Sequence, residues 1–74
     1  MNYSEIIVQY GDGSKPKGTK VVLGFSGGMS KASYTDHQGV AIVEHASTGH
    51  ADVYVSGSKV GSLSAPGRKA VFIS

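Results

Sequence analysis

The sequence predicts an all-β fold, namely a small two-sheet β-sandwich of about seven short strands. Eleven of the 74 residues are glycine, and serine, threonine and valine are also frequent. No stretch shows the apolar period of a helix, and turn signals such as Gly27-Gly28 and Pro66-Gly67 recur between the apolar runs. Short strands at this even spacing are typical of sandwiches and also of small barrels, so a small β-barrel is the alternative.

The expected strands belong to one domain that spans residues 1–74. They cover residues 4–10, 19–25, 30–35, 40–45, 51–56, 59–63 and 69–73, where apolar and β-branched residues gather between turn signals. The segment GDGSKPKG at residues 11–18 is the one flexible loop that we expect, because glycine, proline and lysine dominate it.

The Gly27-Gly28 pair predicts a two-residue hairpin turn, since both positions tolerate the positive φ of a type I′ turn. The register expected from this turn sets Val21 opposite Tyr34. It gathers the apolar side chains of the hairpin on the core face, and these are Val21, Leu23, Phe25, Ala32 and Tyr34.

A second hairpin is expected around the segment EHASTGHAD, residues 44–52, with its loop at residues 46–49. Its register sets His45 opposite His50 and turns four aliphatic side chains inward, namely Val40, Ile42, Val53 and Val55. The opposite face then receives Ala41, Val43, His45, His50, Asp52 and Tyr54.

Residues 36–39 predict a corner at which the chain crosses from one sheet to the other. A tight turn here would pair the expected core residue Tyr34 with the expected outward residue Ala41, which argues for a longer connection. Asp36 is well placed to accept hydrogen bonds from the backbone of the corner, and Gly39 can adopt positive φ.

The pattern Thr35-Asp36-x-x-Gly39-Val40, followed by Gly49-x-x-x-Val53-x-Val55-x-Gly57, resembles the carboxypeptidase-regulatory-like and transthyretin-like modules, which are immunoglobulin-like β-sandwiches. The resemblance covers roughly residues 18–57 and departs from the family at Ala51, where those modules usually carry tyrosine. It implies a non-catalytic role as a stalk, an adhesion, folding or docking domain, or a domain that contacts carbohydrate.

The resemblance also argues against hydroxyisourate hydrolase, the one enzyme on the transthyretin fold. That enzyme ends in a Tyr-Arg-Gly-Ser signature, whereas this chain ends in Val71-Phe72-Ile73-Ser74. Its early histidine is missing too, because the first histidine here is His37. We therefore expect no enzymatic activity and no cofactor.

The expected second hairpin offers candidate metal ligands on its outward face, namely His45, His50 and Asp52. Residues opposite each other across a hairpin have Cβ atoms about 4.5–5.5 Å apart, so both imidazoles could reach one ion. Two histidines and a carboxylate suit zinc or another transition metal. The alternative is that these residues form only a polar, solvent-facing hairpin tip without a metal, and we favour this interpretation. Glu44 points the other way in this register and is left out of the ligand set.

Basic and aromatic residues give a second alternative, a small basic β-barrel that binds single-stranded nucleic acid. Its candidate residues are Lys15, Lys17, Lys20, Lys31 and Tyr54. The net charge of +2 is mild, however, and lysines also serve to guard the edges of sheets. We regard a solvated lysine-bearing face as the better interpretation.

The favoured function is a non-enzymatic protein-binding or structural module, either a homo-oligomer or a domain with a docking partner. A chain of this length buries only about 60% of its unfolded surface, and without cysteine it has no disulfide. Residues 5–10 and 70–73 are apolar on both faces, so they form central strands or edges that a partner covers. The sequence shows no secretory signal and no membrane segment, so we expect a cytoplasmic protein without a membrane partner.

Overall fold

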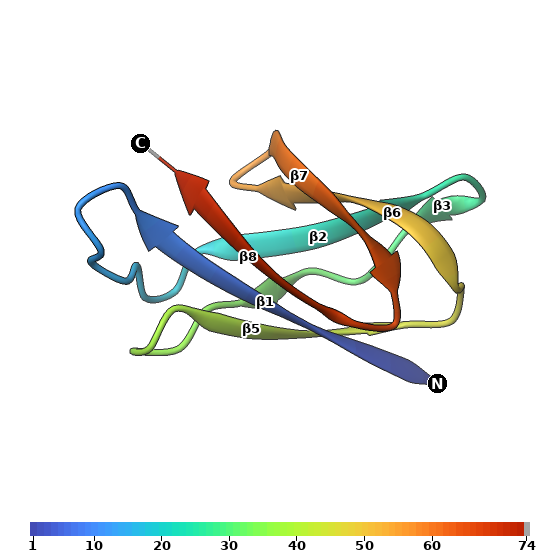
Figure 1. Ribbon diagram of the computed structural model, residues 1–74. Coiled ribbons are helices and arrows are strands. Elements are labelled where there is room, and N and C mark those ends of the chain that lie inside the picture. Colours follow the sequence, from blue (N-terminus) through green and yellow to red (C-terminus); the bar gives the residue numbers. More distant parts are fainter. Residues whose placement is uncertain (74) are drawn as a thin grey trace.

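The computed structural model describes residues 1–73 of the chain. These residues form eight strands in two sheets and no helix (Figure 1). The strands are β1 (Asn2–Tyr10), β2 (Lys20–Phe25), β3 (Gly28–Met29), β4 (Ser33–Tyr34), β5 (Val40–His45), β6 (Gly49–Val55), β7 (Ser58–Ala65) and β8 (Arg68–Ile73). The predicted all-β two-sheet sandwich is confirmed.

The smaller sheet has the strand order β5-β1-β8, and the larger has the order β3-β2-β6-β7 with β4 also paired to β2. Strand β1 runs antiparallel to β5 and parallel to β8. The arrows of β1 and β8 point the same way in Figure 1. The first strand is therefore a central strand, whereas the last strand is an edge. The sequence allowed either a central or an edge position for residues 5–10 and 70–73, and the structure gives the two segments different positions.

The core lies between the facing sides of the two sheets, and alternate residues of each long strand supply it. In β1, Ile6 and Val8 are fully buried, while Ile7 between them is only partly covered. The facing sheet contributes Val21, Leu23 and other aliphatic side chains. This period of two is the pattern of strands that bury one face. The remaining buried apolar residues are Ala41, Val43, Ala51, Val53, Val55, Leu63, Ala65 and Val71.

Of the expected strand at residues 30–35 only β4 forms, and the register with β2 was predicted wrongly. The two-residue turn is Ser26-Gly27 rather than Gly27-Gly28, and β3 follows it directly. Phe25 pairs with Gly28, and Val21 pairs with Ser33 rather than with Tyr34. Ser30 lies between the two short strands, where its hydroxyl accepts a hydrogen bond from the backbone N–H of Leu23 at 2.9 Å. A shift of one residue reverses the face of a side chain, and Tyr34 is accordingly 61% exposed instead of buried.

The expected hairpin between residues 40–45 and 51–56 is wrong as well. Strand β5 pairs with β1, and β6 pairs with β2 and β7, so residues 46–48 connect two different sheets. Val53 and Val55 point inward as predicted, but the faces of β5 are reversed. Ala41 and Val43 are buried, while Ile42 is 51% exposed.

The corner at residues 36–39 is confirmed, since β4 belongs to the larger sheet and β5 to the smaller. One carboxylate oxygen of Asp36 accepts hydrogen bonds from the backbone N–H groups of Gln38 at 2.8 Å and Val40 at 3.1 Å. Gly39 has a φ of 76°. The bonds from Val40 and then Gln38 hold the pKa of Asp36 below its ordinary value of 3.8.

This corner gives the fold an acid-sensitive contact. Because the pKa of Asp36 is lowered in the folded protein, its stabilising contribution is complete above pH 3.8 and is lost as the pH falls through the folded-state pKa. We expect Asp36→Asn to reduce the loss of unfolding free energy between pH 5 and pH 2, measured by urea denaturation at each pH. Glu44→Gln is the control, because Glu44 makes no side-chain hydrogen bond or ion pair within residues 1–73. Equal acid sensitivity in wild type and Asp36→Asn would contradict the assignment.

Candidate functional site

His45 is a structural residue of the interior rather than an exposed ligand. Its side chain is buried at 3% exposure, and its ring lies 5.1 Å from the ring of Phe25. Its Nδ1 lies 2.7 Å from the carbonyl oxygen of Ser47, and its Nε2 lies 2.7 Å from the hydroxyl of Ser4. Since a carbonyl only accepts, Nδ1 carries the proton and Nε2 accepts the hydroxyl hydrogen of Ser4. Both ring nitrogens are thus used inside the protein.

His50 and Asp52 lie instead on the outer face of the larger sheet. The Nε2 of His50 is 3.1 Å from a carboxylate oxygen of Asp52, and the Nζ of Lys59 is 3.3 Å from the same oxygen. The hydrogen bond from Lys59 is the main cause that lowers the pKa of Asp52, followed by that from His50. Within residues 1–73 no group of three histidine, aspartate or glutamate side chains could hold a metal ion. The structure therefore does not bring the three expected metal ligands together.

The residues expected for nucleic-acid binding lie on different loops and strands. Lys15 lies with Ile7 and Arg68 beside the smaller sheet. Lys20 pairs with Tyr34 at the start of β2, and Tyr54 lies on the outer face of the larger sheet with its ring against Gly24. Lys17 precedes β2, and Lys31 lies between β3 and β4. The five residues do not form one continuous binding face.

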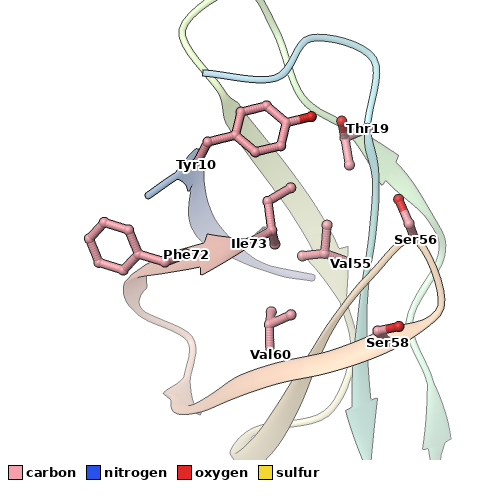
Figure 2. A pocket seen from close by; sticks show the side chains of 8 residues that line it. All are labelled: Tyr10, Thr19, Val55, Ser56, Ser58, Val60, Phe72 and Ile73. Carbon is pink, nitrogen blue, oxygen red and sulfur yellow. The ribbon is translucent and has the colours of Figure 1, made fainter. Parts of the chain in front are cut away.

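An open pocket of about 420 Å³, lined by both apolar and hydroxyl-bearing side chains, lies at one end of the sandwich, and we call it the mouth (Figure 2). Its lining residues come from both sheets and are Tyr10, Thr19, Val55, Ser56, Ser58, Val60, Phe72 and Ile73. Val55, Val60 and Ile73 form its interior, while Phe72 stands at its periphery with 63% of its side chain exposed (Figure 2). The lining carries no acidic, basic or thiol side chain, and half of its residues bear hydroxyl groups. The mouth therefore offers apolar contacts together with neutral hydrogen-bonding groups, rather than acid–base chemistry.

The strand that borders the mouth, β8, presents backbone groups along a free edge. Glu5 lies opposite Arg68, and its N–H donates to the carbonyl of Gly67 at 2.9 Å. In a parallel pair the backbone groups of alternate residues point to the partner strand, so Lys69, Val71 and Ile73 direct theirs to β1. The N–H and C=O groups of Ala70 and Phe72 therefore point away from β1. Strand β7 belongs to the other sheet and does not pair with β8, from which it diverges beyond the connection between them (Figure 1).

The other sheet edges carry features that discourage pairing with another strand. On β5, the carbonyl of Val40 accepts from the N–H of Asp36 at 3.0 Å, and that of Ile42 accepts from the hydroxyl of Ser33 at 2.9 Å. On β7, an irregular register leaves Val60 without an opposite residue. The strands β3 and β4 have two residues each. In the described part of the chain, β8 is thus the edge best prepared to receive another strand.

Comparison with protein-family models, with curated proteins and with solved structures finds no match to this chain. Within residues 1–73 there is also no helix with the length and hydropathy that crossing a membrane requires. With no relative to compare, we define the candidate site by its geometry, namely the edge of β8 and the adjoining mouth.

Proposed function

We propose that this chain is a non-enzymatic docking module that receives an extended protein segment along the free edge of β8. The observation that carries the proposal is that the edge of β8 at Ala70 and Phe72 has no partner strand within residues 1–73 and adjoins the mouth. An added strand gains main-chain hydrogen bonds from such an edge, and its alternate side chains gain apolar contacts in the adjoining pocket.

Two further observations support a binding role over catalysis. The Ser4–His45 pair has the residue types of a nucleophile and its base, but both side chains are at most 3% exposed and no substrate can reach them. The hydroxyl of Ser4 also accepts the N–H of Gly67 at 3.1 Å, which completes its bonding. The resemblance of residues 18–57 to carboxypeptidase-regulatory-like and transthyretin-like modules, most of them non-catalytic, agrees with the proposal.

A titration with a short model strand tests the docking function. A capped hexapeptide of alternating valine and threonine, added at millimolar concentration to dilute protein, is expected to shift the amide NMR signals of Ala70 and Phe72. The signals of Ile42 and Glu44 on the opposite edge should stay in place, because neighbouring groups already use the carbonyl of Ile42. Unchanged spectra, or larger shifts on β5 than on β8, would contradict the proposed docking edge.

A further inference from the structure

The free edge of β8 is also suited to pairing with itself. Resting on the docking function proposed above, we infer that its occupant is β8 of a second copy, which pairs antiparallel about a two-fold axis at Val71. The two small sheets then join into one of six strands, with the order β5-β1-β8-β8-β1-β5. A two-fold contact of this kind is closed, whereas parallel pairing of the same edges would not relate the copies by such an axis.

The backbone geometry of β8 supplies the bonds for this pairing. With the axis at Val71, Ala70 of one copy lies opposite Phe72 of the other, and the same pair recurs on the other side of the axis. These are the residues whose N–H and C=O groups point to the free edge, so each pair exchanges two hydrogen bonds. The large exposed ring of Phe72 then lies beside the small exposed side chain of Ala70.

Other registers about a two-fold axis are less favourable. An axis at Ala70 sets Lys69 opposite Val71, which places a charge against a side chain of the core that is only 3% exposed. An axis at Lys69 sets this residue opposite its own copy, and like charges in that position repel. An axis at Phe72 sets Val71 opposite Ile73 and leaves Ala70 without an opposite residue among those described. Fewer of the described residues then contribute backbone bonds. The axis at Val71 keeps the two Lys69 residues apart and uses Ala70 and Phe72 of both copies for backbone bonds. It sets Lys69 opposite the partly exposed Ile73 at the end of the contact rather than opposite the buried Val71.

The charges at the start of β8 are compatible with this contact. The Nε of Arg68 is 2.7 Å from a carboxylate oxygen of Glu5 in the same chain, so the positive charge of Arg68 is balanced locally. Lys69 lies opposite Ile73 of the second copy, at the far end of the contact from its own equivalent. The aliphatic part of a lysine side chain can cover an apolar neighbour while its ammonium group stays in water.

Sedimentation equilibrium of the intact chain tests the contact. We expect wild type to form a concentration-dependent dimer, and Phe72→Lys to weaken it at least about tenfold, since every dimer carries the added charge twice. Ile42→Lys is the matched control, because Ile42 is 51% exposed on β5, the opposite edge of the same sheet. This control should dimerise like wild type. Circular dichroism spectra and melting curves confirm that both variants are folded.

Disulfide trapping tests the register, and it needs no charge substitution. The chain contains no cysteine, so Val71→Cys introduces a single thiol. In the inferred register the two copies of residue 71 form a non-hydrogen-bonded pair with Cα atoms about 4.5 Å apart, within the range of a disulfide. Mild oxidation should therefore yield a covalent dimer. Val43→Cys should remain monomeric under the same conditions, because Val43 is a buried valine on the other edge strand.

The outcomes separate this inference from the docking function itself. A wild-type monomer at all concentrations, or a Val71→Cys variant that fails to cross-link, would overturn pairing with a second copy in this register. The hexapeptide titration would still decide whether β8 accepts a strand. A dimer that Ile42→Lys disrupts and Phe72→Lys does not would instead place the contact on the outer face of the smaller sheet.

Discussion

Gly39→Ala is expected to lower the free energy of unfolding by about 2–4 kcal/mol, which would make it one of the most damaging single substitutions in this chain. Gly39 has a φ of 76°, which side chains with a Cβ adopt at a cost of about 1–2 kcal/mol. An added Cβ would also collide with the carbonyl oxygen of Val8 and lie 3.1 Å from the Cβ of Lys15. The backbone cannot simply withdraw, because the N–H of Val8 donates to the carbonyl of Gly39 at 2.8 Å.

Gly57→Ala separates the collision from the backbone strain. Gly57 has a φ of 86°, but nothing lies within 4 Å of the position that its Cβ would occupy. We expect this variant to lose only the strain contribution, about 1–2 kcal/mol, in urea denaturation under the conditions used for Gly39→Ala. Equal losses in the two variants would show that the contact with Val8 has no energetic effect at Gly39.

The positions of most strands could be predicted from the sequence because their patterns are local. Runs of β-branched and apolar residues bounded by glycine mark β2, β5, β6 and β8 within a few residues. The corner at residues 36–39 was predictable for the same reason, since Asp36 and Gly39 form its hydrogen bonds and its turn within a few positions.

Strand partners could not be predicted in the same way, because they depend on contacts between distant segments. The register at His45 and His50 assumed that consecutive strands pair, as they often do. Strand β5 instead pairs with β1, whose Ile6 and Val8 occupy the inner face. The sequence Val40-Ala41-Ile42-Val43 allows either face to turn inward, since all four residues are apolar. The partner strand decides between the two faces, and no local signal identifies it.

The candidate site was predictable only in part. Residues 70–73 are apolar on both faces, which indicated a central strand or an exposed edge, and the structure shows the edge. The mouth brings Tyr10 of β1 beside Val55 and Val60 of the consecutive strands β6 and β7, which lie far from β1 in sequence, so no motif reveals it. The Ser4–His45 hydrogen bond likewise joins residues 41 positions apart. The histidine looked like a ligand because its burial could not be inferred from its neighbours.

Ser4→Ala is expected to lower the free energy of unfolding by about 1–3 kcal/mol, because it leaves the buried Nε2 of His45 without a partner and removes the acceptor of the partly buried N–H of Gly67. The hydroxyl of Ser4 donates to Nε2 of His45 at 2.7 Å and accepts the N–H of Gly67 at 3.1 Å. Ser4 is 1% exposed and His45 is 3% exposed, so solvent cannot replace the bond between them without a rearrangement. Ser64→Ala, an exposed position on β7, should change the stability by less than about 0.5 kcal/mol.

A double-mutant cycle with His45→Phe distinguishes the loss of hydrogen bonds from a simple loss of volume at Ser4. Phenylalanine keeps an aromatic ring beside Phe25 but presents no ring nitrogen for Ser4 to bond. In that background Ser4→Ala removes only the acceptor for the N–H of Gly67, so its cost should fall by about 1 kcal/mol or more. If the two substitutions were additive in urea denaturation, the Ser4–His45 bond would contribute nothing. Ser4 would then act only through its bond to the N–H of Gly67 and by filling space where the N-terminal half of β1 passes the start of β8.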